Sequence, residues 1–174
     1  MDLKQLLLSA HKILDEAGID HALIGGLALG ALGVQRFTND VDFLINGDLR
    51  MQAKIAFLKL GYKVFHESEE VLQLEGPGQI DFLFANRDLS RMMIKNAKPI
   101  QELGIKSICA EDLIALKIQS YVNAPKREFH DKADIQALIE KHKDLDWDKI
   151  KSYANIFNEW HSILAIKKKI EFNQ

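Results

Sequence analysis

The stretch RFTNDVDFLI, residues 36–45, places two carboxylates one residue apart at the start of an apolar run. Alternate residues of a strand point to the same face, so Asp40 and Asp42 share one face while Val41 and Phe43 point to the other. The apolar letters that follow favour a strand in the core. Two acids beside such a core repel each other and lose hydration unless positive charge compensates them. A divalent cation is one such compensation, and Mg²⁺ favours one or two carboxylates, retained water and phosphate oxygens.

A third acid, Asp81, interrupts the apolar stretch QIDFLFA, residues 79–85. If this second strand pairs beside the strand that carries Asp40 and Asp42, the three carboxylates converge. Three converging acids are able to hold two Mg²⁺ ions about 3.5–4 Å apart, an arrangement used for in-line phosphoryl displacement. The pattern therefore predicts a two-ion site at which one ion activates a hydroxyl and the other neutralises a triphosphate.

A glycine pair, Gly25-Gly26, ends the short apolar strand HALIGG and precedes a small-residue helix expected over residues 27–33. Bare backbone N–H groups at a helix N-terminus favour phosphate binding. The pair alone is more often a tight strand–helix turn than a phosphate site. Together with the acids of the next strand, it predicts a phosphate cradle beside a metal site.

The order of the expected elements predicts an α/β (α+β) fold, in which a core with a mixed sheet is followed by a helical part. Residues 1–110 are expected to form the core and residues 111–174 a C-terminal helical part packing on it. Hydrophobic spacing and turn residues predict strands over residues 21–26, 40–45, 62–67, 70–76, 79–85 and 103–110, and helices over residues 2–17, 27–33, 49–60, 89–97, 111–122, 128–142, 147–160 and 161–172.

Length and composition are those of a globular protein. The 174 residues are 47% hydrophobic and 28% charged, and the net charge of −2 gives no global attraction to nucleic acid or membrane. The single cysteine, Cys109, excludes an internal disulfide, and no stretch is apolar over the roughly 18 residues of a membrane span. With no signal-peptide pattern at the N-terminus, a cytoplasmic location without membrane contact is expected.

The stretch LIGGLALGALGVQRFTNDVDFLI, residues 23–45, resembles the signature of the DNA polymerase β-like nucleotidyltransferase superfamily. That signature joins Gly-Gly or Gly-Ser to an Asp-x-Asp strand and to a third Asp on a later strand. Arg36 and Thr38, with the later ALKIQSY and REFHDKADIQAL, most resemble the AbiEii-type branch, which includes toxins of toxin–antitoxin systems. The resemblance spans roughly residues 20–142, and it implies a minimal nucleotidyltransferase core.

The resemblance also implies residue roles. Asp40, Asp42 and Asp81 would bind metal as the catalytic acids, with Asp81 as the base for the incoming hydroxyl. Among the nucleotide-binding residues, Lys117 would reach a phosphate from the helical part. The remaining nucleotide-binding residues would be Gly25, Gly26 and Thr38. Many relatives have Ser where this chain has Gly26, so a hydroxyl contact to phosphate is missing and backbone N–H groups would have to replace it.

The same residues could have purely structural roles. Asp40 could cap a turn while Asp42 pairs with Arg36, and Asp81 could pair with a lysine. Lys117 has apolar neighbours and could extend to water as an ordinary helix residue.

Further along the chain, Asp131 and Asp134 lie three residues apart on one expected helix. They are expected to pair with Arg127 or Lys132, or to orient Lys117. Five of the six histidines show no metal-ligand spacing and are interpreted as surface or core residues; they are His11, His21, His66, His142 and His161.

The sequence therefore predicts a Mg²⁺-dependent, NTP-dependent nucleotidyltransferase with two ions. The acceptor hydroxyl stays open between an RNA 3′ end, a protein and a small molecule. The toxin resemblance adds a possible antitoxin protein as partner. Two rivals remain: a non-catalytic nucleotide-binding or antitoxin-like module, and a phosphate-releasing hydrolase.

Overall fold

The computed structural model describes residues 2–101 and 103–172. The chain divides into two compact units. The first comprises Met1–Ala31 and Arg36–Ile108, and the second comprises Leu32–Gln35 and Cys109–Gln174. The division into a core of residues 1–110 and a C-terminal helical part of residues 111–174 packing on it stays a prediction.

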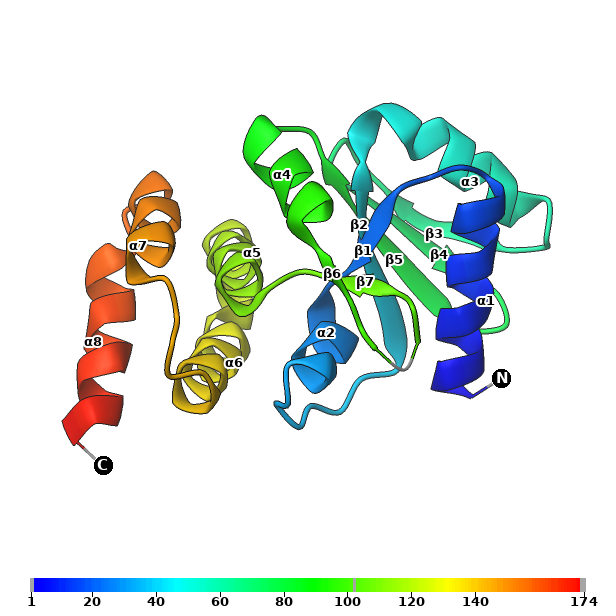
Figure 1. The fold of residues 1–174 in the computed structure, drawn as a ribbon. Coiled ribbons are helices and arrows are strands. Elements are labelled where there is room, and N and C mark those ends of the chain that lie inside the picture. Colours follow the sequence, from blue (N-terminus) through cyan, green and yellow to red (C-terminus); the bar gives the residue numbers. More distant parts are fainter. Residues whose placement is uncertain (1, 102, 173–174) are drawn as a thin grey trace. The chain divides into compact units, whose positions relative to one another are not determined.

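The described residues form a mixed α/β structure with a helical C-terminal part, as expected (Figure 1). The strands are β1 (His21–Leu23), β2 (Asp40–Asn46), β3 (Lys63–Glu67), β4 (Val71–Glu75), β5 (Gln79–Ala85), β6 (Lys98–Pro99) and β7 (Lys106–Ser107). The helices are α1 (Leu3–Glu16), α2 (Gly25–Ala31), α3 (Arg50–Leu58), α4 (Asp88–Asn96), α5 (Ala110–Asn123), α6 (Glu128–Lys141), α7 (Trp147–Ile156) and α8 (Trp160–Phe172), with short 3₁₀ turns η1 (Gly47–Leu49) and η2 (Pro125–Arg127).

All seven described strands belong to the first unit and form one sheet in the order β3-β4-β5-β2-β1-β7-β6. The central pair, β2 and β5, is parallel, and β1 and β7 are also parallel. The remaining neighbours are antiparallel. The chain segment between β2 and β5 supplies α3 and the β3–β4 hairpin, so the sequence neighbour of β2 is not its partner in the sheet.

Aromatic side chains fill one face of the sheet. Phe43 of β2 and Phe82 of β5 lie with ring centroids 6.4 Å apart, and Phe57 of α3 meets Phe82 edge-on at 5.2 Å. All three are essentially fully buried. The alternation of each strand sends the intervening residues, Asp42 and Asp81, to the opposite face.

The second unit contains α5 to α8, which pack in the pairs α5–α6, α5–α7, α6–α8 and α7–α8. Helix α5 is apolar on most sides and is therefore the most buried of the four. The short segment Leu32–Gln35 belongs to the same unit, where the carbonyl oxygen of Leu32 lies 3.0 Å from His142 Nε2.

Several details differ from the sequence-based expectations. The strand expected over residues 103–110 is only β7, Lys106–Ser107, and the strand expected over residues 21–26 ends at Leu23. Helix α2 begins at Gly25, so the glycine pair forms its first turn instead of preceding it. The helix expected over residues 147–160 ends at Ile156, because Asn158 adopts a positive φ of 59° before α8 begins. The edge strand β6 was not expected, since its two residues carry no readable pattern.

Among the described residues, no helix combines the length and the apolar character needed to cross a membrane.

Candidate active site

Parallel pairing of β2 with β5 brings three acids together. Asp42 and Asp81 are direct partners in the register, and Asp40 lies opposite Gln79. Asp40 shares the face of Asp42 because it is two residues away on the same strand. One carboxylate oxygen from each of the three lies within 4.8 Å of the other two, and all three residues are half-buried. The convergence expected from the sequence is therefore present.

Polar side chains orient two of these acids. The Thr38 hydroxyl donates a short hydrogen bond to Asp40 Oδ1. Gln73, the residue of β4 paired with Asp81, donates from Nε2 to Asp81 Oδ2 at 2.6 Å. Such hydrogen bonds restrict the rotation of a carboxylate without neutralising its charge, which suits an acid that must face a cation.

The sequence did not single out Gln73. Its position inside the alternating strand VLQLE, as a polar residue between two buried leucines, is the signal that places it on the face of Asp81. The position of Gln73 opposite Asp81 is known only from the pairing of β4 with β5.

Gly25 lies directly against the acids. Its φ of +64° is in the left-handed region, and a Cβ at this position would overlap Asp42 Oδ2. A side chain here is therefore excluded both by the backbone conformation and by the carboxylate. The Ile24 amide donates to the Asp42 carbonyl oxygen at 3.0 Å, which holds the start of α2 beside β2.

Gly26 faces Thr38 instead. A Cβ at Gly26 would lie 2.6 Å from Thr38 Cβ and 2.8 Å from Thr38 Oγ1. The departure from Gly-Ser in the sequence thus has a steric reason, since Thr38 fills the space in which a serine side chain would begin. Its hydroxyl, oriented on Asp40, lies where the first turn of α2 meets the acid face.

Lys117 lies in the second unit, on α5. Its Nζ donates to Asp131 Oδ1 at 2.9 Å and to Asp134 Oδ2 at 2.7 Å, both on α6. Arg127 Nε contacts Asp131 Oδ2 at 3.4 Å, whereas Lys132 pairs with Glu128 instead. Asp131 therefore pairs with both Lys117 and Arg127, and Asp134 pairs with Lys117, so both expected arrangements occur. A phosphate contact of Lys117 remains a prediction.

No protein-family model matches this chain, and no curated protein sequence matches it significantly.

Solved structures do match. The antibiotic-resistance factor ANT(2'')-Ia in solution aligns with a TM-score of 0.68 at 19% identity, over 95% of this chain and 97% of that chain. The lincomycin-bound lincosamide antibiotic adenylyltransferase LnuA aligns with a TM-score of 0.59 at 16% identity, over 82% of this chain and 99% of that chain. A nucleotidyltransferase-like antigenic protein from Paracoccidioides brasiliensis aligns with a TM-score of 0.54 at 19% identity, over 95% and 92%.

These identities are too low to carry an activity, but the alignments cover nearly the whole of each chain. The narrower expectation of an AbiEii-type branch stays a prediction from the sequence. The chain has the fold of the nucleotidyltransferases that it resembles.

Proposed function

We propose that the protein is a Mg²⁺-dependent nucleotidyltransferase that transfers a nucleoside monophosphate from an NTP to a hydroxyl group of a small molecule. The observation that carries the proposal is the acid triad of Asp40, Asp42 and Asp81 with the bare backbone of Gly25 against it. Hard carboxylate oxygens on one sheet face fit Mg²⁺ better than a softer ion.

Bound Mg²⁺, expected as two ions, would neutralise the triphosphate and lower the pKa of the attacking hydroxyl. The chain's own groups supply position and proton transfer. Asp40 and Asp42 would bind the metal ions. The hydrogen bonds from Thr38 and Gln73 keep the carboxylates of Asp40 and Asp81 directed at the metal site. The Gly25-Gly26 backbone lets the triphosphate approach where any side chain would block it.

In the transfer step, the acceptor oxygen forms a bond to the α-phosphorus of the NTP. The bond from that phosphorus to the bridging oxygen breaks, and pyrophosphate leaves with the electron pair. The Asp81 carboxylate takes the hydroxyl proton. Charge neutralisation and alignment supply most of the acceleration in such a step.

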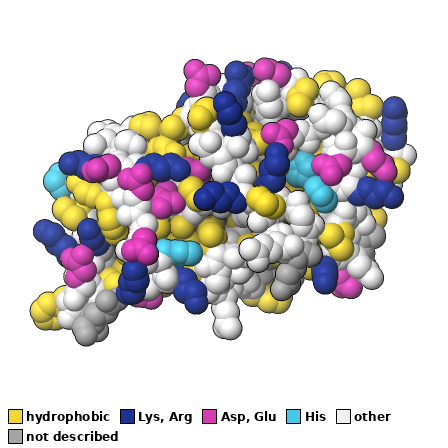
Figure 2. All heavy atoms as spheres, viewed as in Figure 1, with side chains coloured by type: hydrophobic (Ala, Val, Ile, Leu, Met, Phe, Trp, Pro, Cys, Tyr) yellow, Lys and Arg dark blue, Asp and Glu magenta, His cyan; other side chains and the backbone are white. Residues whose placement is uncertain are grey.

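Two considerations favour a small-molecule acceptor over an RNA end. The structural neighbours of matching length include ANT(2'')-Ia in complex with adenylyl-2''-tobramycin and LnuA with lincomycin bound. In addition, acidic and basic side chains intermingle on the face shown in Figure 2 and do not gather into one basic region there. A generic grip on RNA needs such a region.

The test incubates the protein with each α-labelled NTP, Mg²⁺ and a panel of hydroxylated antibiotics, and follows transfer of the label and release of pyrophosphate. We expect label on at least one small acceptor, lost by at least about a hundredfold in Asp42→Asn. Asp48→Asn is the matched control, since Asp48 is an exposed acid of the same unit that pairs with Arg91. Equal transfer by the Asp42→Asn variant would remove the proposal.

The rival functions give different results in the same assay. A non-catalytic nucleotide-binding module would bind NTP with Mg²⁺ and release no pyrophosphate with any acceptor. A hydrolase would release phosphate from NTP without an acceptor. Label on RNA or on protein would correct the acceptor class. An antitoxin partner and a cytoplasmic location stay predictions that rest on the sequence.

A further inference from the structure

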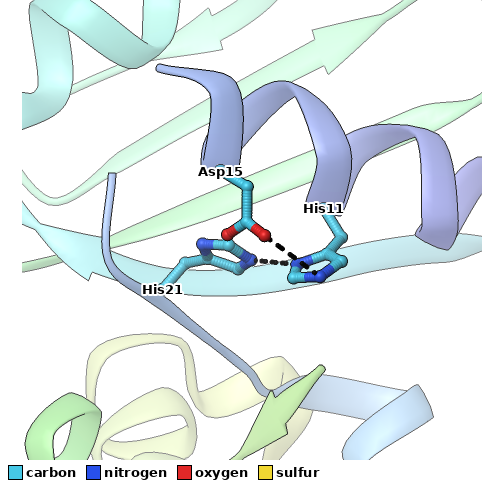
Figure 3. A group of neighbouring side chains, drawn as sticks. All are labelled: His11, Asp15 and His21. Atoms are coloured by element: carbon cyan, nitrogen blue, oxygen red, sulfur yellow. Dashed lines mark hydrogen bonds and ion pairs between the residues drawn. The ribbon is translucent and has the colours of Figure 1, made fainter. Parts of the chain in front are cut away.

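A second cluster of metal-ligating side chains lies on the opposite face of the sheet from the acid triad. His11 and Asp15 are on α1, four residues apart, and His21 is the first residue of β1 (Figure 3). His21 pairs in register with Ile45 and its ring meets Phe43 edge-on at 5.1 Å. It therefore points to the aromatic face, whereas Asp42 points away from it.

The three side chains converge closely. His11 Nδ1 lies 2.7 Å from His21 Nε2, and His11 Nε2 lies 3.5 Å from Asp15 Oδ2. One ligand atom from each residue lies within 4.8 Å of the other two. Sequence reasoning found no metal spacing among the histidines and did not consider His11 together with Asp15, whereas the fold brings His11, Asp15 and His21 together. The missed signal was the His-x-x-x-Asp spacing, which places both side chains on one helix face.

The chain's return from α1 to β1 brings His21 to that helix face. Helix α1 ends at Glu16, Gly18 turns the backbone with a φ of +67°, and the Ile19 amide donates to the Leu14 carbonyl oxygen at 2.9 Å. This closure leaves His21 buried beside the last two turns of α1.

His21 is oriented as metal-binding histidines are. Its Nδ1 lies 2.7 Å from the Ile19 carbonyl oxygen, which must be a donated hydrogen bond because a carbonyl only accepts. That bond leaves Nε2 as the atom with a lone pair, and Nε2 faces His11 Nδ1 at 2.7 Å.

A divalent cation is complemented in charge by the ligand set that converges here, two imidazoles and one carboxylate. Nearby charges are engaged elsewhere, since Lys12 pairs with Glu16 and Lys106 with Asp20.

We propose that His11, Asp15 and His21 form a Zn²⁺ site that joins α1 to β1. Imidazole ligands select Zn²⁺ over Mg²⁺, and two histidines with one carboxylate form a common zinc set with a fourth position for water. Zn–N distances of about 2.0–2.1 Å at tetrahedral angles separate the two nitrogens by roughly 3.3 Å. The rings must therefore open by about 0.6 Å from 2.7 Å. The proton on His11 Nδ1 moves to His11 Nε2, so the ring binds Zn²⁺ through Nδ1 as a neutral imidazole.

Solvent access supports loading of the ion. The His11 and Asp15 side chains are 23% and 62% exposed, while His21 is 4% exposed. An ion can thus enter from the helix side and be held from the sheet side. Because the ligands come from α1 and β1, the bound ion stabilises the folded first unit by mass action.

The test titrates the full chain, freed of metal by chelation, with Zn²⁺ in millimolar Mg²⁺ that fills the acid triad. We expect one Zn²⁺ per chain, a rise in melting temperature on binding, and intense visible absorption of the Co²⁺ form, which indicates tetrahedral geometry. His11→Ala should weaken binding at least tenfold, with a smaller loss in Asp15→Asn. His11 is partly exposed, so its removal leaves the fold intact, and the circular dichroism of the metal-free variant should match that of the parent.

Two controls separate this site from the rest of the molecule. His66→Ala removes an exposed histidine of β3, and Asp42→Asn alters the triad; both should leave Zn²⁺ affinity unchanged. The proposal fails if His11→Ala binds Zn²⁺ as tightly as the parent, or if the metal-free parent binds none. Failure of the transferase assay would not affect this result, because the readout is metal affinity alone.

Discussion

At the scale of single residues, the glycines of α2 show how a missing side chain defines a site. Gly25 and Gly26 are excluded from carrying a Cβ by Asp42 and Thr38, respectively. Gly30 of the same helix has nothing within 4 Å of its virtual Cβ and no positive φ. The three positions therefore look alike in sequence and differ only in what surrounds them.

We expect Gly25→Ala to abolish nucleotidyl transfer and to lower the free energy of unfolding by about 1–3 kcal/mol, through the left-handed strain and the displaced Asp42 carboxylate. Gly30→Ala is the matched control and should stabilise the protein by about 0.5–1 kcal/mol, because alanine is the better helix former. Urea unfolding and the transfer assay measure both effects. A fully active Gly25→Ala variant would contradict the placement of the cradle.

At Cys109, burial suppresses the reactivity of a thiol. It is the N-cap of α5, where a helix terminus favours a thiolate, yet burial raises the pKa of the thiol to about 11. Roughly one thiol in a thousand is then ionised at pH 8.

Alkylation of Cys109 by iodoacetamide should therefore be slow in the folded protein at pH 8 and rise about tenfold per pH unit towards pH 10. The unfolded chain has the ordinary thiol pKa of 9.0 and loses its proton first, so this group lowers the stability of the fold as pH rises from about 9 to 11. Mass spectrometry with and without urea measures the rates. Equal rates in both states would refute the burial argument.

At the scale of elements, α5 and α6 are joined by a buried ion cluster. The Lys117 side chain is 10% exposed and those of Asp131 and Asp134 are 1% and 7% exposed. Placing one cation between two acids offsets the cost of burying them, but the balance depends on every partner remaining in place.

Lys117→Ala should therefore cost about 3–5 kcal/mol of unfolding free energy, because two buried carboxylates lose the cation between them. Lys132→Ala removes a half-buried lysine that pairs with Glu128 and lies over the Tyr121 ring, and should cost about 1 kcal/mol or less. Denaturant unfolding of both variants tests the contrast. Similar losses would mean that Lys117 is not a structural cation.

At the scale of the whole molecule, the net charge of the protein affects which class of acceptor it attracts. The chain has 23 basic and 25 acidic residues, a net charge of −2, and both signs intermingle on the face shown in Figure 2. Long-range attraction to a polyanion is therefore weak, and specificity must come from local contacts around the site.

Transfer to a small acceptor should change less than about tenfold in kcat/KM between 50 and 200 mM salt at constant Mg²⁺. An RNA acceptor gripped through six to ten phosphates would lose about 10³–10⁵ in affinity over the same range. Steady-state kinetics at four salt concentrations measure the slope. A steep fall would favour a nucleic-acid acceptor over the one proposed.

Much of the architecture was predictable because it is local. The alternation of β2 and β5 places the acids and the aromatic residues on opposite faces of each strand, and the spacing of leucines in α1 defines its buried side. The end of α7 was not predictable. The helical spacing of apolar residues continues past Ile156 in the sequence, but the positive φ of Asn158 ends the helix. Edge strand β6 was missed because two residues carry no periodicity.

The sequence by itself determined which residues share a face: Asp40 with Asp42 on a strand, and His11 with Asp15 on a helix. Only the tertiary structure decided which of these pairs meets a third residue. Asp81 reaches Asp40 and Asp42 because two strands about forty residues apart pair in parallel. His21 reaches His11 and Asp15 because the chain turns back from α1 to β1. Side-chain direction follows from backbone geometry over a few residues, whereas strand partners are chosen by burial across the whole unit. For the same reason, the roles of Gly26, Thr38 and Gln73 beside the acids can be recognised only in the folded chain.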